Sequence, residues 1–129
     1  MNKSLRVPDY LGHILDALER IDGYTAGMDE ASFLRTPMVQ DAVVRNIEII
    51  GEAANNVQRM APAFVAEHAD IPWQVMYAMR NRLCHAYHKV DLRIVWLTIK
   101  RDLPALFTQV KQLYEAIAGS SPTTPQDEE

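Results

Sequence analysis

Apolar residues recur at three- and four-residue steps along nearly the whole chain of 129 residues. This spacing is typical of α-helices with one buried face, because an α-helix completes a turn every 3.6 residues. The sequence shows none of the two-residue alternation that half-buried strands produce. The period therefore predicts an all-α fold, a bundle of four to five main helices with short connections.

Prolines and aspartates mark the expected helix starts. Asp29 suits the N-cap of a short helix that carries Phe33 and Leu34, because its carboxylate can accept a backbone N–H of the first turn. Prolines tolerated in a first helical turn open or precede the other helices, at Pro8, Pro37, Pro62 and Pro72.

The last periodic stretch runs from Leu92 to Ile117 and contains Pro104. Proline interrupts a helix because it lacks a backbone N–H and its ring clashes with the preceding turn. Two structures fit this pattern: one kinked helix, or two nearly collinear helices with Asp102 as the second N-cap.

The helix expected from Pro37 to about Met60 has Gly51 at its middle. A glycine inside a helix costs about 1 kcal/mol relative to alanine. Such a glycine often permits a close contact with another helix.

The length predicts one domain. We expect residues 1–119 to form this helical domain. The remaining residues, 120–129, read SSPTTPQDEE and have no apolar face, so they are expected to be a disordered tail.

The net charge of −4 argues against broad, non-specific binding to nucleic acid, although it allows a local basic patch. The single cysteine, Cys84, excludes an internal disulfide and fits a reducing cytoplasm. No apolar run approaches the length of a membrane-spanning helix, so we expect a cytoplasmic protein without a membrane partner.

The segment from position 80 to 88, RNRLCHAYH, concentrates chemically active side chains. Arginine binds phosphate with a planar fork of donors, and histidine exchanges protons near neutral pH. Asn81 and His85 are four residues apart and would share a helix face, whereas Arg80 and His85 lie roughly 140° apart on an ideal helix. Arg80 and His85 can therefore converge only if the helix loosens or a second surface completes the site.

These residue types suit the cleavage of RNA. That reaction needs a base for the 2′-hydroxyl, an acid for the leaving oxygen and a cation beside the phosphate. No metal or other cofactor is required, and the chain has no carboxylate cluster suited to two magnesium ions. One His85 supplies one proton-transfer group, so a two-fold homodimer would supply the second.

The motif Arg80-Asn81-x-x-x-His85-x-Tyr87 resembles the R-x4-H-x-Y signature of the HepT-like HEPN ribonuclease toxins. The resemblance extends to DAVVRNIEIIGEAANNV at 41–57, to IPWQVMYAMRNRLCHAYHKVD at 71–91 and to IVWLTIKRDLPALFTQV at 94–110. Together these segments cover most of the chain before the tail.

The resemblance implies an all-helical homodimer of the HEPN type, in which two R-x4-H motifs meet in a cleft and cleave RNA without a metal. It implies that Arg80 and His85 are catalytic and that Asn81 positions the phosphate or His85. It also implies that a cognate MNT nucleotidyltransferase, the antitoxin of a HEPN/MNT pair, neutralises the toxin by AMPylation of Tyr87. The alternative is a non-catalytic helical dimer that binds a nucleotidyltransferase or a nucleotide.

Other residues near the motif have simpler interpretations. Arg82 contacts either RNA backbone or solvent. Cys84 is most simply a small buried side chain, and His88 with His85 lacks the third ligand that a zinc site needs.

Glu48 and Glu52 are four residues apart and are interpreted as solvated, or paired with a base such as Arg45, although one of them could orient Arg80. The remaining large apolar side chains are expected to pack in the core or a dimer interface, at Trp73, Met76 and Trp96.

Overall fold

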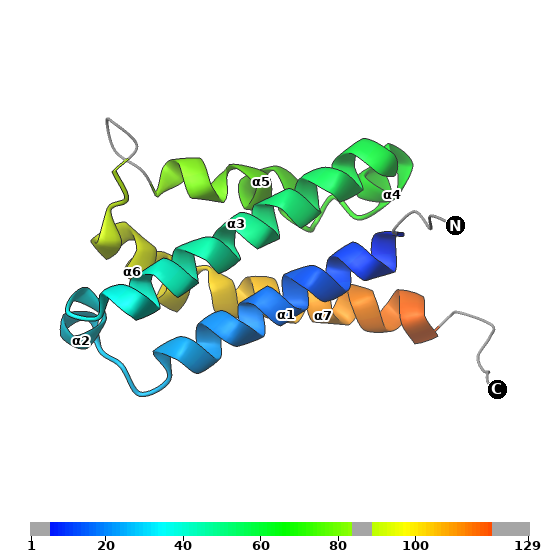
Figure 1. Ribbon diagram of the computed structural model, residues 1–129. Coiled ribbons are helices and arrows are strands. Elements are labelled where there is room, and N and C mark those ends of the chain that lie inside the picture. Colours follow the sequence, from blue (N-terminus) through cyan, green and yellow to red (C-terminus); the bar gives the residue numbers. More distant parts are fainter. Residues whose placement is uncertain (1–5, 84–88, 120–129) are drawn as a thin grey trace, which may run out of the picture.

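The computed structural model describes residues 6–83 and 89–119, and this part of the chain forms seven helices (Figure 1). Five helices have ten or more residues: α1 (Val7–Thr25), α3 (Pro37–Met60), α5 (Trp73–Arg82), α6 (Leu92–Arg101) and α7 (Leu103–Gly119). Two are short, α2 (Glu30–Leu34) and α4 (Pro62–Glu67). The prediction of an all-α bundle with four to five main helices is confirmed.

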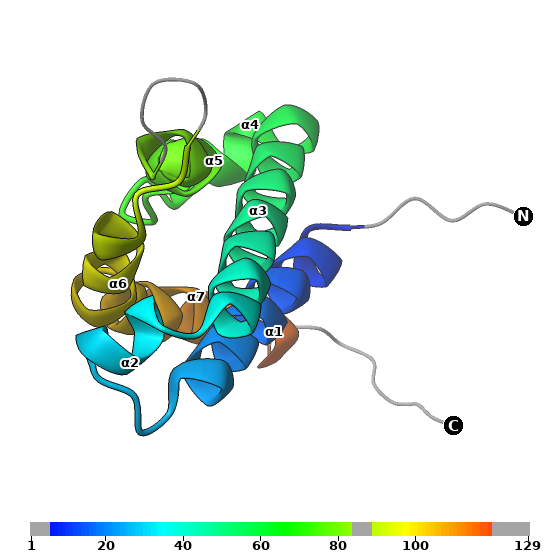
Figure 2. The ribbon, with the colours of Figure 1, turned by 60° about the vertical axis from the view of Figure 1, so that its left-hand side comes forward.

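Helix α3 lies at the centre of the bundle. It packs along α1 on one side and along α5 on the other, and these are the two largest helix contacts (Figures 1 and 2). Helix α7 lies beside α1 and continues the chain from α6. The arrangement leaves α5 attached mainly to α3, so the geometry of any site on α5 depends on that one contact.

The apolar stripe predicted for α3 forms the core. All five of its members are completely buried: Val43, Ile47, Ile50, Ala54 and Val57. The aromatic and methionine side chains expected in the core are also buried, with exposed fractions of 3% for Trp73, 0% for Met76 and 6% for Trp96.

The buried face of α1 is wider than one row of residues. Ile14, Leu18 and Ile21, which are spaced three and four residues apart, are buried as helical periodicity predicts, and Tyr10 of the same row is half-buried at the edge of the core. Leu11 and Ala17 are also completely buried, because α1 packs against both α3 and α7.

The cap of α2 is confirmed. The backbone N–H of Ser32 donates to the Asp29 carboxylate at 2.8 Å, and the backbone N–H of Asp29 donates to the Ser32 hydroxyl at 3.0 Å. Donation from the backbone N–H of Ser32, and then from its side chain, favours the ionised carboxylate and lowers the pKa of Asp29.

Proline positions agree with the expected starts. Pro37 and Pro62 are the first residues of α3 and α4, and Pro8 lies in the first turn of α1. Pro72 occupies the N-cap of α5 and directly precedes the helix.

The stretch from Leu92 to Ile117 forms two helices, so the alternative of one kinked helix is wrong. Asp102 ends α6 and directly precedes α7, and its carbonyl accepts the backbone N–H of Leu106 at 3.2 Å. Pro104 is the second residue of α7. A proline is tolerated there because the N–H groups of the first turn have no partner within the helix, and proline has no N–H.

Among the described helices, none is both long and apolar enough to span a bilayer. The tail predicted at residues 120–129 lies outside the described residues.

Gly51 sets the distance between α3 and α5. A Cβ atom at position 51 would lie 3.2 Å from the carbonyl oxygen of Met76 and 3.3 Å from that of Tyr77. These oxygens belong to the backbone of α5, which cannot rotate away as a side chain would. The close helix contact expected from the sequence is therefore present, and α5 could not approach α3 as closely if position 51 carried a side chain.

We predict that Gly51→Ala lowers the free energy of unfolding by about 0.5–2 kcal/mol, because the overpacking cost exceeds the gain in helix propensity. Gly12→Ala is the matched control, since nothing lies within 4 Å of a Cβ built at Gly12 of α1. It should raise the free energy of unfolding by about 0.5–1 kcal/mol. Urea denaturation measures the free energy of unfolding of both variants. An equal increase in the two variants would show that α5 can move away from α3 without cost.

Candidate active site

A groove of about 410 Å³ lies between α3 and α5. Each helix contributes residues spaced three or four apart, which places them on one face. The lining residues are Glu48, Gly51, Glu52 and Asn55 of α3 with Tyr77, Arg80 and Asn81 of α5. Arg80 and Asn81, the first two residues of the predicted motif, therefore line a groove whose opposite wall is α3.

Arg80 is tied to α3 by an ion pair. Its Nε–H donates to the Oε2 atom of Glu48 at 2.6 Å, across two helices and 32 positions of sequence. The other oxygen of Glu48 faces Arg45, one turn away on α3, at 3.5 Å. Glu48 thus pairs with Arg45, as the sequence suggested, and more closely with Arg80.

This ion pair contributes little to stability. The side chain of Arg80 is 49% exposed and that of Glu48 is 28% exposed, so water screens their attraction. Pairs of this kind are worth about 0–1 kcal/mol. The larger effect is on geometry, because a short bond to Nε fixes the plane of the guanidinium.

The structure brings Arg80 and Asn81 together in one groove, but α5 ends at Arg82. The expectation that Asn81 and His85 share a helix face stays a prediction, because His85 lies beyond the described end of α5. The side chains of His85 and Tyr87, like Cys84 and His88, lie outside the described residues.

Described residues hold both ends of the segment that carries His85 and Tyr87. Leu83 is 2% exposed, and its carbonyl accepts the backbone N–H of Asp91 at 2.7 Å. Asp91 also caps α6, because its Oδ1 atom accepts the N–H groups of Arg93 at 3.0 Å and Ile94 at 3.2 Å. The chain thus leaves α5 and enters α6 at one anchored point.

Arg82 lies in a different groove from Arg80. Its groove, of about 320 Å³, separates α5 from the junction of α6 and α7 and also contains Arg101 and Asp102. The predicted RNA contact of Arg82 would therefore be made away from the Arg80–Asn81 groove.

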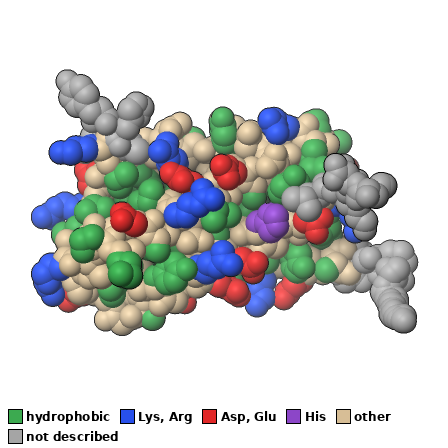
Figure 3. All heavy atoms as spheres, in the orientation of Figure 1, with side chains coloured by type: hydrophobic (Ala, Val, Ile, Leu, Met, Phe, Trp, Pro, Cys, Tyr) green, Lys and Arg blue, Asp and Glu red, His purple; other side chains and the backbone are tan. Residues whose placement is uncertain are grey.

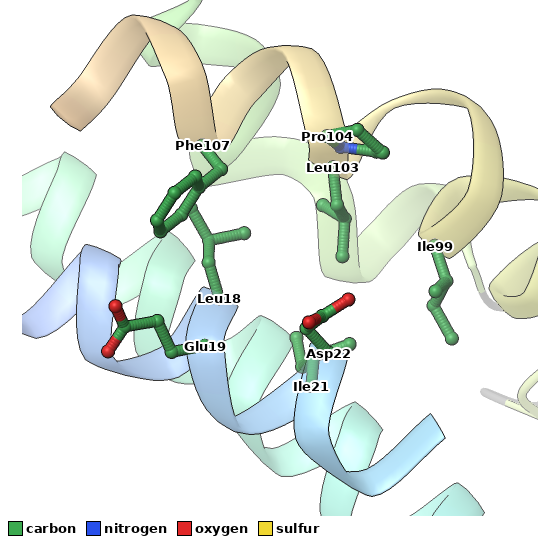
Figure 4. A pocket seen from close by; sticks show the side chains of 8 residues that line it. All are labelled: Leu18, Glu19, Ile21, Asp22, Ile99, Leu103, Pro104 and Phe107. Carbon is green, nitrogen blue, oxygen red and sulfur yellow. The ribbon is translucent and has the colours of Figure 1, made fainter. Parts of the chain in front are cut away.

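A third pocket, of about 310 Å³, lies between α1 and the start of α7 (Figure 4). Its walls are mostly apolar, with the carboxylates of Glu19 and Asp22 among them. Among the described residues that line it there is no arginine or histidine. Two carboxylates would repel a phosphate, so this pocket does not suit a phosphodiester.

Charged side chains are mixed on the face shown in Figure 3, where blue and red groups lie next to one another. This face has no broad basic surface, in keeping with the net charge of −4. Within residues 6–83 and 89–119, no three His, Cys, Asp or Glu side chains are placed to share a metal ion.

The family model described as "Ribonuclease HepT-like" matches residues 14–113. The chain belongs to the HepT-like ribonuclease family. It is 41% identical over 105 residues to the "Probable ribonuclease HepT" of Thermococcus cleftensis, covering 81% of this chain and 93% of that protein. It is 37% identical over 106 residues to "Putative RNase TTE0752" of Caldanaerobacter subterraneus, covering 82% and 92%.

A third relative of this HepT-like chain is longer. "Gamma-glutamylcyclotransferase and putative RNase MJ0434" of Methanocaldococcus jannaschii is 37% identical over 117 residues, which are 91% of this chain and 50% of that protein. No solved structure gave a significant match to the chain.

Sequence reasoning on this HepT-like chain undervalued Glu48 and missed Asn55 and Tyr77 as groove residues. A signal was available, because Glu48, Gly51 and Asn55 fall at three- and four-residue steps on one helix face. The partner helix could not be inferred from that pattern, since it lies far away along the chain.

We predict that Asp91→Ala lowers the free energy of unfolding by about 1 kcal/mol, because two N–H groups of α6 lose their acceptor. Hydrogen exchange at the amide of residue 91, which bonds to Leu83, should become faster. Asp91→Asn retains a capping oxygen and should stay close to the parent in both measurements. Unchanged stability and exchange in Asp91→Ala would show that the cap does not hold this junction.

Proposed function

We propose that this HepT-like protein is a metal-independent endoribonuclease that acts as a homodimer and is the toxin of a HEPN/MNT toxin–antitoxin pair. The observation that carries the proposal is Arg80, the first residue of the R-x4-H motif, held beside Asn81 in an open groove. Membership in the HepT-like ribonuclease family and relatives named as ribonucleases support the same activity.

In the proposed reaction the guanidinium of Arg80 binds the scissile phosphate and stabilises the charge that grows on its oxygens. His85 takes the proton of the ribose 2′-hydroxyl, whose oxygen attacks phosphorus. The bond from phosphorus to the 5′-oxygen breaks, and His85 of the partner subunit donates a proton to that oxygen. The products are a 2′,3′-cyclic phosphate and a free 5′-hydroxyl.

An exposed aromatic side chain on α5 supports the homodimer. Tyr77 is 47% exposed and lines the same groove as Arg80 and Asn81. Association of two copies through this surface would bury apolar area and bring two motifs into one cleft.

The proposed antitoxin is a nucleotidyltransferase of the MNT type that transfers AMP from ATP to the hydroxyl of Tyr87. The new phosphodiester places a negative charge and a nucleotide three positions after Cys84, within the motif segment. An anion tethered there would compete with the RNA phosphate for Arg80.

We predict that the purified protein cleaves single-stranded RNA without added metal, and that its expression arrests growth. His85→Ala should lower the cleavage rate by more than about 10²–10⁴-fold, the usual contribution of one general acid or base, because the homodimer loses both groups. Arg80→Ala should lower it by about 10²–10³-fold, because the developing charge loses its partner. Gel analysis of labelled RNA measures the rates, and sedimentation of the same samples measures the dimer.

Arg93→Ala is the matched control for Arg80→Ala, since Arg93 also pairs with a glutamate, Glu30 at 3.4 Å, away from the groove. It should cleave at the parent rate. If the Arg80 and His85 variants arrest growth as strongly as the parent, the alternative of a non-catalytic binding module is favoured.

We predict that incubation with the cognate nucleotidyltransferase and ATP adds the mass of AMP to Tyr87 and abolishes cleavage. Tryptic mass spectrometry locates the adduct. Tyr87→Phe, which keeps the ring and lacks the hydroxyl, should cleave RNA and resist inactivation. An adduct on another residue, such as the exposed Tyr77, would contradict the assignment of Tyr87.

A further inference from the structure

The carboxylate of Glu48 forms a short contact with the motif arginine. Its Oε2 atom lies 2.6 Å from Nε of Arg80, and the two residues face each other across the α3–α5 groove. Nothing in the R-x4-H motif requires an acidic partner from a different helix. The role of this glutamate therefore needs its own explanation.

Holding the two helices together is a weak explanation. The helices already meet at Gly51, where a Cβ atom would lie only 3.2 and 3.3 Å from carbonyl oxygens of α5. The side chains of Gln58 and Gln74 form a second link between the same helices at 3.1 Å. A half-exposed ion pair adds little to such a contact.

Orientation is a stronger explanation. An unbound arginine side chain has many rotamers, and freezing them during the reaction raises the barrier. The bond to Glu48 engages Nε–H, one of the five donors of the guanidinium. Such a bond restrains the plane of the group, and with it the direction of the Nη groups that can form two-pronged contacts with phosphate.

The negative charge of Glu48 has an opposing effect, since it weakens the attraction between Arg80 and phosphate. This effect is limited, because both side chains are partly exposed and water screens charge. Screening has less effect on the orientation that the hydrogen bond gives to the Arg80 guanidinium. Glu48 should therefore change the rate of the chemical step more than the affinity for RNA.

We propose that Glu48 is the positioning residue of the active site, holding Arg80 in the orientation that stabilises the transition state. This inference rests on the proposed ribonuclease function. Glu48 itself touches neither substrate nor reacting atoms.

The test compares Glu48→Gln with the parent full-length protein. RNA cleavage at saturating and limiting substrate gives kcat and KM, and a 2′-deoxy oligonucleotide gives binding without cleavage. We expect kcat to fall about 10- to 100-fold, as for a misplaced catalytic group, and KM and oligonucleotide binding to change less than about threefold. Thermal unfolding should be nearly unchanged, which separates positioning from a structural role.

Three further variants sharpen the result. Glu30→Gln removes the carboxylate of the α2–α6 ion pair with Arg93 and should leave cleavage unchanged. Glu52→Gln removes one negative charge from the same groove without touching the Glu48 carboxylate, so it should alter KM more than kcat. Glu48→Asp keeps the charge but is one methylene shorter, and it should lose nearly as much kcat as Glu48→Gln.

The hydrogen bond of Arg80 can also be measured directly, without RNA cleavage. In ¹⁵N NMR spectra the Nε–H signal of Arg80, assigned by its loss in Arg80→Lys, should shift and exchange faster with water in Glu48→Gln. Arg93 supplies the internal reference signal.

The outcomes distinguish the positioning role of Glu48 from the proposed ribonuclease function. A parent that cleaves RNA with a Glu48→Gln variant of equal or higher kcat overturns the positioning role and leaves the ribonuclease in place. Equal losses of kcat in Glu48→Gln and Glu52→Gln also overturn it, because charge and not the bond to Arg80 would then be responsible. A parent that cleaves no RNA, while the Arg80 signal still responds to Glu48→Gln, overturns the proposed function and the catalytic role together but leaves the ion pair.

Discussion

The close approach of α3 and α5 at Gly51 is the contact on which the candidate site depends. Because the carbonyl oxygens of Met76 and Tyr77 lie where a side chain would begin, the two helices run nearly backbone to backbone. At that distance Glu48 on one helix reaches the guanidinium of Arg80 on the other. Gly51 itself lines the groove into which Arg80 and Asn81 project, so the close contact and the candidate site share one place in the fold.

Most of the fold could be predicted from the sequence, because helical periodicity and N-terminal caps are local properties. The α3 stripe, the Asp29 cap and the proline-marked starts are all present. The face of α1 could not be predicted to the residue, since Leu11 and Ala17 are buried by neighbours distant in sequence. The choice between one helix and two near Pro104 was open, because a proline can either kink a helix or end it.

The candidate site was predictable in its residue types and only partly in its geometry. Arg80 and Asn81 were found from the motif, and both line the groove. Glu48 was named only as one of two glutamates that could orient Arg80, because a contact across 32 positions leaves no mark on local spacing. The shared helix face of Asn81 and His85 stays a prediction, because His85 lies outside the described residues. His85 and Tyr87 keep the roles that the family resemblance implies as predictions.

The hydrogen bond between Asp91 and Leu83 has a consequence for how this scaffold tolerates change. It holds the end of α5 against the start of α6, so Leu83 and Asp91 lie side by side although eight positions of sequence separate them. Lengthening the chain between two points fixed in this way raises the entropy cost only slowly. Insertions between them should therefore leave the packing of the described helices unchanged, and the number of residues at this place in the chain can vary without a change of fold.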